Sequence, residues 1–306
     1  MNHFFRICSF IAFSYTALYS QEISNIPVVE SNPIRVGSYN VWNPAFEMNY
    51  GDTNTWQSRL PHIVATVREA DPDILCLQEM SLDCYSDLVS ILGREDRYLS
   101  FYCPHKKKMH SDHPPGRDGL AVLIKPFLFD GVQVHTSHSS ERPTRRRDLW
   151  LDVQIPGSGK SIRIATTHLD ATGAEKGHTQ LANLVEDINK ESDDIIFFIV
   201  CGDFNEGDKE DMRPRALIME QSGFISDGSL VPTRPEGIRD TLHKGHIDWI
   251  YFREVTDEAL KIKFVKGSAL GDARASDHKL IYTDFYFTIE REQAKKGKLA
   301  DYTHRD

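Results

Sequence analysis

The chain has 306 residues, of which 40% are hydrophobic and 26% are charged, as in an ordinary globular protein. Its formal net charge of −9 gives no support to a protein that binds nucleic acids avidly and nonspecifically, although a local basic patch can still bind a polyanion. No internal repeat, linker or low-complexity tract divides the sequence, so we expect one large folded domain.

The N-terminal segment differs in composition from the rest. The residues from Ile7 to Leu18 are mostly apolar and follow Arg6, and their number fits the apolar core of a secretory signal but is short for a membrane span. We therefore expect a signal peptide at 1–20, a lead-in at 21–33, a catalytic domain at 34–290 and a charged tail at 291–306. The protein would be exported to the periplasm or the extracellular space, where Cys84 and Cys103 can pair. A buried or frayed N-terminal segment is the alternative, and no later stretch resembles a transmembrane helix.

Strand-like runs rich in Val, Ile, Phe and Tyr recur along the chain. They are Ile34–Val41, Ile74–Gln78, Leu120–Lys125, Leu149–Ile155, Ile162–His168, Ile195–Cys201, His246–Phe252 and Leu280–Thr288. The helical spacing of apolar residues predicts helices at Trp56–Ala70, Ser86–Gly93, Glu175–Lys190 and Pro214–Ser222. Strands outnumber helices and often follow one another directly, which favours two sheets packed face to face with helices outside.

Four short polar clusters stand at the ends of apolar runs. They are Gln78-Glu79, Thr167-His168-Leu169-Asp170, Gly202-Asp203-Phe204-Asn205 and Ser276-Asp277-His278. Acids, amides and histidines at strand ends predict one site at the rim of a sheet. Carboxylate, amide and imidazole groups suit a hard cation, so the clusters indicate Mg²⁺, with Mn²⁺ as an alternative, and an oxyanion substrate.

The acidic residues of these clusters can carry a hydrolytic reaction. Glu79 ends a buried strand, where a carboxylate must be hydrated, paired or metal-bound. Gly202 permits a sharp turn, so Asp203 and Asn205 point to the same side. Asp203 can then accept a proton from water, and Asn205 can donate to a phosphoryl oxygen. An Asp/Asn turn after a strand is the structural alternative.

Two histidines are candidates for acid/base chemistry. Asp248 can orient the ring of His278, which is a usual acid/base or oxyanion-stabilising device. A salt-bridged strand pair of His246 and Asp248 is the alternative. His168 is the second imidazole, and a structural histidine is the alternative there.

Other polar residues are weaker candidates. Asn40 can bind a metal-bound water or orient Glu79, and Asp118 can bring another carboxylate to the rim, with a plain turn as the alternative for both. The basic loops Lys106–Lys108 and Arg142–Arg147 can hold a phosphate-rich substrate through residues such as Arg145 and Arg147, if they lie near the site. A solvated charge run is the alternative.

Seven motifs, taken in order, resemble the endonuclease/exonuclease/phosphatase superfamily of DNase I-like enzymes. They are Ser38-Tyr39-Asn40, Leu77-Gln78-Glu79, Asp118-Gly119-Leu120-Ala121, Thr167-His168-Leu169, Gly202-Asp203-Phe204-Asn205, His246-Ile247-Asp248-Trp249-Ile250 and Ser276-Asp277-His278. The resemblance spans nearly the whole predicted mature chain. It implies an α+β fold, a four-layered α/β/β/α sandwich of two mostly antiparallel sheets with outer helices, and a divalent-metal-dependent phosphoester hydrolase.

The resemblance also implies roles at the metal and for the attacking water. Glu79 would be the main Mg²⁺ ligand, supported by Asn40 and assisted by Asp277. Asp203 would orient or deprotonate the water.

The remaining matched residues would act on the phosphoryl group. Asn205 and His168 would stabilise the phosphoryl oxygens. His278, held by Asp248, would protonate or polarise the same group. No covalent enzyme intermediate is needed, because the cation polarises the phosphoryl group during in-line attack.

We predict from these features an exported phosphodiesterase that uses metal-activated water. A nuclease is the favoured function. Nucleic acid is favoured over phospholipid because of the basic loops and the Asp-Phe-Asn form of the catalytic motif, and we expect a monomer. A lipid or inositol phosphoesterase of the same fold, sphingomyelinase-like or 5-phosphatase-like, is the alternative. A non-catalytic binding module is a remote one, because it predicts loss of several site residues and all are present.

Overall fold

A computed structural model describes most of the predicted catalytic domain. The described residues are 33–43, 55–105, 118–126, 129–137, 146–171, 174–190, 193–205, 214–227, 232–235, 246–255, 260–271 and 273–289. The predicted signal peptide, the charged tail, Lys106–Lys108 and Arg145 lie outside them. Within these ranges, every helix is too short or too polar to cross a membrane.

The first sheet has six strands in the order β11-β12-β1-β2-β4-β3. Their bounds are β1 (Ile34–Asn40), β2 (Ile74–Gln78), β3 (Leu99–Pro104), β4 (Gly119–Ile124), β11 (Leu260–Leu270) and β12 (Leu280–Ile289). Strands β1 and β2 are parallel, and the other neighbours are antiparallel.

The second sheet also has six strands, in the order β5-β6-β7-β8-β10-β9. Their bounds are β5 (Gly131–Thr136), β6 (Leu149–Gln154), β7 (Ser161–His168), β8 (Ile195–Asp203), β9 (Ile225–Ser226) and β10 (Asp248–Glu254). Here β7 and β8 form the parallel pair, and the other neighbours are antiparallel. The prediction of two mostly antiparallel sheets is confirmed.

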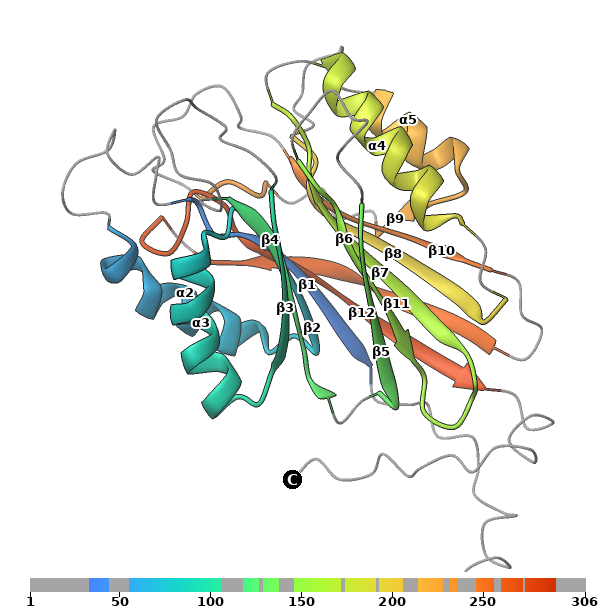
Figure 1. Ribbon diagram of the computed structural model, residues 1–306, viewed down its shortest axis with the longest axis horizontal. Coiled ribbons are helices and arrows are strands. Elements are labelled where there is room, and N and C mark those ends of the chain that lie inside the picture. Colours follow the sequence, from blue (N-terminus) through green and yellow to red (C-terminus); the bar gives the residue numbers. More distant parts are fainter. Residues whose placement is uncertain are drawn as a thin grey trace, which may run out of the picture.

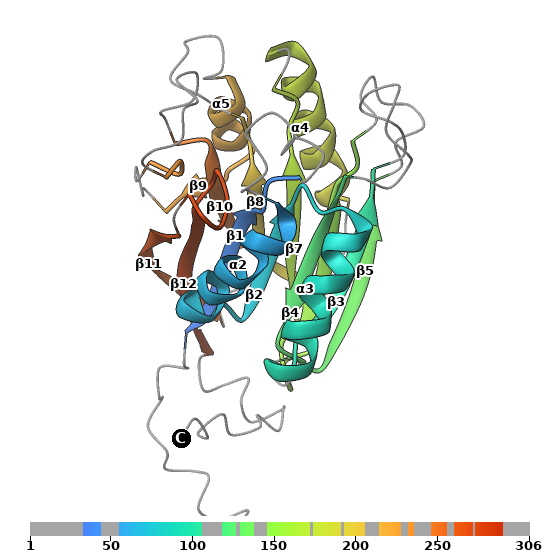
Figure 2. The same ribbon diagram turned by 90° about the vertical axis from the view of Figure 1, so that its left-hand side faces the viewer.

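Four helices cover the outer faces of the sheets in the described part of the chain. Helices α2 (Trp56–Ala70) and α3 (Leu82–Glu95) pack on the first sheet, and α4 (Ala174–Ile188) and α5 (Pro214–Gln221) pack on the second. A third apolar cluster, which includes Val36, Ile164 and Phe197, fills the space between the sheets. Figure 1 shows these four layers, and Figure 2, turned by 90°, places α2 and α3 in front of the first sheet. The α/β/β/α sandwich is therefore confirmed.

Local sequence signals account for the helix bounds. The Thr55 side chain accepts a hydrogen bond from the Ser58 amide at the start of α2, and Ser81 caps α3 in the same way through Cys84. Asp71 ends α2 in the left-handed conformation. Cys84 and Cys103 are both buried free thiols, so the structure does not contain the pairing that an oxidising compartment would permit.

Two crossovers bring four strand ends together. Helix α2 links the parallel strands β1 and β2, and α4 links the parallel strands β7 and β8. In each pair the last residues are in register, Asn40 with Gln78 and His168 with Asp203. Functional groups of α/β sheets gather outside the carboxyl ends of parallel strands. Each sheet therefore contributes two such ends.

Gly202 is required where β8 approaches the end of β7. Its φ of 146° disfavours other residues, and an added Cβ would lie 2.0 Å from the Thr167 carbonyl oxygen. Gly159 also has a positive φ, of 67°, but an added Cβ there would meet nothing within 4 Å.

We predict that Gly202→Ala lowers the free energy of unfolding by about 3 kcal/mol more than the matched control Gly159→Ala, because only the former forces the backbone to move. The control should cost about 1 to 2 kcal/mol, from its backbone conformation alone. Urea denaturation of the two variants measures the difference. Equal losses of unfolding free energy in the two variants would show that the close approach of Gly202 to the Thr167 carbonyl does not require a glycine.

Candidate active site

The Asn40 side chain joins the two sheets at the rim. Its Nδ2 donates to Glu79 Oε1 at 2.9 Å and to Asp203 Oδ2 at 3.0 Å. Glu79 directly follows β2 of the first sheet, and Asp203 ends β8 of the second. The structure thus brings Asn40, Glu79 and Asp203 together, as the sequence predicts.

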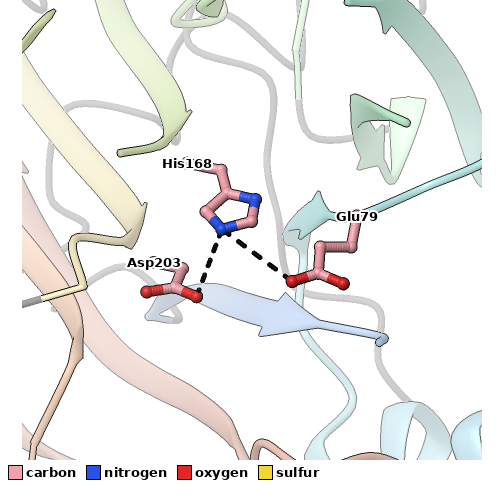
Figure 3. Close-up of side chains that lie close together, drawn as sticks. All are labelled: Glu79, His168 and Asp203. Carbon is pink, nitrogen blue, oxygen red and sulfur yellow. Dashed lines mark ion pairs between the residues drawn. The ribbon is translucent and has the colours of Figure 1, made fainter. Parts of the chain in front are cut away.

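His168 lies over the same pair of carboxylates. Its Nε2 is 3.8 Å from Glu79 Oε1 and 3.5 Å from Asp203 Oδ2, and Figure 3 shows the ring facing both groups. Burial lowers the pKa of His168 well below its ordinary value, and the positive charge of Arg146 lowers it further. The imidazole is therefore neutral and can act as a ligand or a hydrogen-bond donor.

Glu79 is held in an unusual conformation. Its φ of 61° lies in the left-handed region, where non-glycine residues cluster at functional sites. Its Oε2 accepts the Asn43 amide at 2.7 Å. Burial raises the pKa of Glu79, and the neighbouring Asp277 and Asp118 carboxylates raise it further. A bound cation would lower the pKa of Glu79 again, because it would neutralise the surrounding negative charge and favour the ionised carboxylate.

The turn after β8 fixes Asp203 and Asn205. The Asn205 amide donates to Asp203 Oδ1 at 2.8 Å, and Asn205 has a φ of 48°. Its side-chain Nδ2 donates to the Leu169 carbonyl at 2.9 Å, which ties the turn to the end of β7. Burial raises the pKa of Asp203 to about 6, against the opposing charge of His278. Asp203 is therefore a carboxylate whose basicity is suited to accepting a proton near neutral pH.

A buried arginine supports this turn from outside. Arg215 of α5 is fully buried and donates to the carbonyls of Phe204 and Asp170. Gly177 of α4 leaves room for it, because an added Cβ would lie 2.1 Å from Arg215 Nη2. The loops after β7 and β8 are thus held by one side chain.

His278 and Asp248 form a buried pair. His278 Nδ1 lies 2.8 Å from Asp248 Oδ2, and its Nε2 lies 3.6 Å from Asp203 Oδ2. Burial opposes the charged ring, but the attraction of Asp248, Asp277 and Asp203 prevails and raises the pKa of His278 to about 9. His278 is thus a protonated imidazole, and Asp248 lies where the sequence predicts, beside the ring that it orients.

Arg234 is a site residue that the sequence analysis missed. Its side chain, 14% exposed, donates from Nη1 to the Asp277 carboxylate and to the Asp277 carbonyl. The adjacent Thr233 accepts the Lys279 amide at 2.6 Å, which fixes the segment beside His278. Burial lowers the pKa of Arg234, but Asp277, Asp203 and Asp248 more than compensate and raise it. No sequence motif marks this pairing, because Arg234 and Asp277 lie on separate loops.

The basic residues of the β5–β6 connection have internal partners. Arg146 Nη1 donates to the carbonyls of His168 at 2.7 Å and Leu169 at 3.0 Å, and the Arg147 amide donates to His105 Nδ1 at 2.9 Å. Burial raises the pKa of Asp118 to about 6 although Arg146 opposes it. Arg145 lies outside the described residues, so substrate binding by Asp118, Arg145 and Arg147 stays a prediction.

Two clusters of described side chains have the spacing of a metal site. The ligand atoms of Glu79, His168 and Asp203 lie within 4.8 Å of one another, as do those of Asp203, Asp248 and His278. A protonated His278 cannot donate a lone pair, so the second cluster fits a divalent cation poorly, and Glu79 of the first cluster is the better ligand. The nearby Asp277 Oδ1 and both Asp118 oxygens are buried, and none has a hydrogen-bond partner in the described residues. Such oxygen-rich surroundings suit a hard cation.

Comparison with known proteins places this site in a family. A model of the Endonuclease/Exonuclease/phosphatase family matches residues 37–278. Nocturnin of Xenopus laevis is 27% identical over 260 residues, which cover 76% of this chain and 65% of that protein. Protein angel homolog 2 of Mus musculus is 32% identical over 168 residues, 49% of this chain and 29% of that protein. This chain thus spans less than two thirds of the length of both relatives.

A solved structure agrees with the sequence matches. The human Nocturnin catalytic domain with bound sulfate anion is similar with a TM-score of 0.63 and 26% sequence identity. The match covers 85% of this chain and 97% of that chain. The DNase I-like sandwich is therefore the fold of this protein.

The protonated state of His278 makes stability depend on pH in the metal-free protein. Its folded-state pKa of about 9 lies above the ordinary value of 6.5, so folding takes up a proton between these pH values. The stability from His278 is complete below pH 6.5 and is lost as the pH rises through 9.

We predict a fall of up to about 3 kcal/mol in the free energy of unfolding over this pH range with a chelator present. His278→Gln should flatten the profile, and Asp248→Asn should move the fall to lower pH. Urea titrations at a series of pH values measure it. Identical profiles for the wild type and His278→Gln would contradict the assignment.

Proposed function

The chain belongs to the Endonuclease/Exonuclease/phosphatase family, whose members are hydrolases acting on phosphoester bonds, and we propose that it is a divalent-metal-dependent phosphodiesterase that acts on nucleic acid. The observation that carries this proposal is the Asn40 amide, which binds Glu79 and Asp203 at one rim. It holds Glu79, the carboxylate proposed to bind the cation, beside Asp203, a carboxylate that can accept a proton. Metal-assisted hydrolysis of a phosphoester by water can use both groups next to each other.

Glu79 would hold the cation, with Asn40 fixing its carboxylate and Asp277 completing the negative surroundings. Mg²⁺ fits best, since the nearby ligands are mostly oxygens, and Mn²⁺ is the alternative. When bound, the cation would polarise the phosphoryl group and neutralise charge that develops in the transition state.

Asp203 would accept the proton of the attacking water. Its two oxygens are fixed by the Asn40 side chain and the Asn205 amide, so the carboxylate does not need to reorient during the reaction. Burial keeps its pKa at about 6, so it is both ionised and basic at neutral pH.

The two histidines would act on the phosphoryl oxygens. Protonated His278, held by Asp248, would donate a hydrogen bond or a proton where negative charge develops. Neutral His168 and the side-chain amide of Asn205 would donate hydrogen bonds without adding charge. No side chain has to form a covalent bond to phosphorus.

Nucleic acid is the favoured substrate because the family includes endonucleases and exonucleases. Sulfate, bound in the human Nocturnin structure, is a tetrahedral oxyanion like phosphate. The net charge of −9 argues that binding depends on local contacts at the site and not on overall charge.

We predict that the purified protein with Mg²⁺ hydrolyses DNA or RNA and that EDTA abolishes the activity. Asp203→Ala and His278→Ala should each lower kcat by about 100-fold to 10,000-fold, the range for loss of a general acid or base. The measurement is a rate assay with plasmid DNA, RNA, sphingomyelin and a phosphoinositide.

The matched control is Asp130→Asn. Asp130 is an exposed acid that accepts a hydrogen bond from the Gly157 amide, away from the rim. It should keep wild-type rates. Wild-type turnover in the Asp203 or His278 variant would refute the assigned roles. Hydrolysis of only sphingomyelin or phosphoinositide would instead establish the lipid or inositol phosphoesterase alternative, and activity that survives EDTA would refute the metal dependence.

We also propose export, on the basis of the apolar run from Ile7 to Leu18 after Arg6. The full chain expressed in cells should then yield a shortened protein that begins near Gln21 outside the cytoplasm. Mass spectrometry of fractionated cells identifies the N-terminus, and Ile11→Asp should retain the chain inside because it breaks the apolar core. An intact N-terminus in the cytoplasmic fraction of wild-type cells would contradict export.

A further inference from the structure

Arg59 of α2 is one of the largest fully buried side chains in the described residues, and it lies outside the proposed machinery. Its Nη1 donates to the carbonyls of Val41 at 2.7 Å and Ala275 at 3.0 Å, and its Nη2 donates to the Trp42 carbonyl at 2.8 Å. Burying an arginine is costly unless its donors are satisfied. These bonds to the backbone therefore account for its presence inside the fold.

The three carbonyls belong to two segments that carry site residues. Val41 and Trp42 directly follow Asn40 at the end of β1, and Ala275 directly precedes the Ser276-Asp277-His278 motif. A second bond joins the same segments, since Ser276 Oγ donates to the Asn40 carbonyl at 2.7 Å. Arg59 thus lies at the junction between the cation-binding side of the site and its acid/base side.

The turn that Arg59 holds is strained. Trp42 has a φ of 59°, a conformation that is unfavourable for a bulky residue and persists only where its surroundings impose it. The Arg59 guanidinium lies 5.1 Å from the centre of the Trp42 ring and 5.7 Å from that of Trp56, as in cation–π contacts. Arg59 therefore contacts both the carbonyl and the ring of the strained residue.

The strained turn aims two amides at the site. The Trp42 amide donates to Asn40 Oδ1 at 3.0 Å, and this bond leaves Asn40 Nδ2 directed at Glu79 and Asp203. The Asn43 amide donates to Glu79 Oε2 at 2.7 Å. If the turn relaxed, both Asn40 and Glu79 would lose the contacts that orient them.

We propose that Arg59 is a positioning residue of the cation pocket, which holds the turn after β1 and the segment before Asp277 in the single arrangement that presents Glu79 and Asn40. The inference rests on the proposed function only in taking Glu79 as the main metal ligand. Partners that orient metal ligands typically contribute 10-fold to 100-fold in metal affinity.

The test compares two buried arginines. Arg163 of β7 is also buried, and it binds the Asp152 carboxylate and the carbonyls of Ile188 and Lys190 without contacting the rim. Arg59→Met should weaken Mn²⁺ or Mg²⁺ binding to the metal-free protein by about 10-fold to 100-fold, while Arg163→Met should stay within about twofold of the wild type, although both lose stability. Isothermal titration calorimetry below the melting temperature of each variant measures the affinity.

A second readout does not require the metal. Amide hydrogen exchange of Trp42 and Asn43 should become at least about tenfold faster in Arg59→Met than in Arg163→Met, because the turn opens locally. Arg59→Lys, which keeps a donor and the charge, should lie between the wild type and Arg59→Met in both measurements, and it serves alone if Arg59→Met does not fold.

Unchanged metal affinity in folded Arg59 variants, or an equal loss in Arg163→Met, would overturn the proposal. If the wild type itself binds no metal, the proposed function fails, and amide exchange alone decides whether Arg59 holds the turn. Unchanged exchange at Trp42 and Asn43 would then overturn the inference about Arg59.

Discussion

The Asn40 side-chain amide joins carboxylates from the two sheets at the candidate site. Asn40 Nδ2 binds a carboxylate from each sheet, and both carboxylates have a pKa raised by burial. Hydrogen bonds to an ionised carboxylate favour its charged form. Asn40 therefore lowers the cost of keeping two acids close together at the rim of the two sheets.

The convergence of residues far apart in the sequence follows from a repeated arrangement of strands. Each sheet contains one parallel pair joined by a helix, β1-α2-β2 in the first and β7-α4-β8 in the second. Parallel strands end at the same edge, so each unit brings two residues of the candidate site to that edge, Asn40 and Glu79 in one and His168 and Asp203 in the other. The apolar core between the sheets packs them face to face, so the strand ends of one sheet lie opposite those of the other. Two buried arginines on the outer helices, Arg59 and Arg215, bind backbone carbonyls of the loops that follow these strands.

The central strands and the four helices could be predicted from the sequence because their apolar residues are buried and periodic. The strands that were missed, β3, β5, β9 and β11, are the four edge strands of the two sheets. Edge strands bury less surface, and Val134 of β5 and Phe264 of β11 are 46% and 39% exposed, so their patterns resemble loops. Site residues at the ends of central strands could also be predicted, because the apolar runs that precede them are easy to recognise. Arg59 and Arg234 were not, because they act through carbonyls or a carboxylate on distant loops, which no local spacing reveals.

The two histidines show how burial produces opposite chemistry at one site. His168 and His278 are both buried, and desolvation disfavours the charged form of each. Around His168 the strongest further influence is Arg146, so the ring stays neutral, whereas around His278 three carboxylates reverse the balance. Environments that separate the pKa values of like groups assign them different roles in catalysis. Arg146 thus contributes to the site although its donors point to backbone carbonyls. Its charge adds to the effect of burial, and together they keep His168 neutral beside Glu79 and Asp203, where a protonated ring would compete with a cation for the same carboxylates.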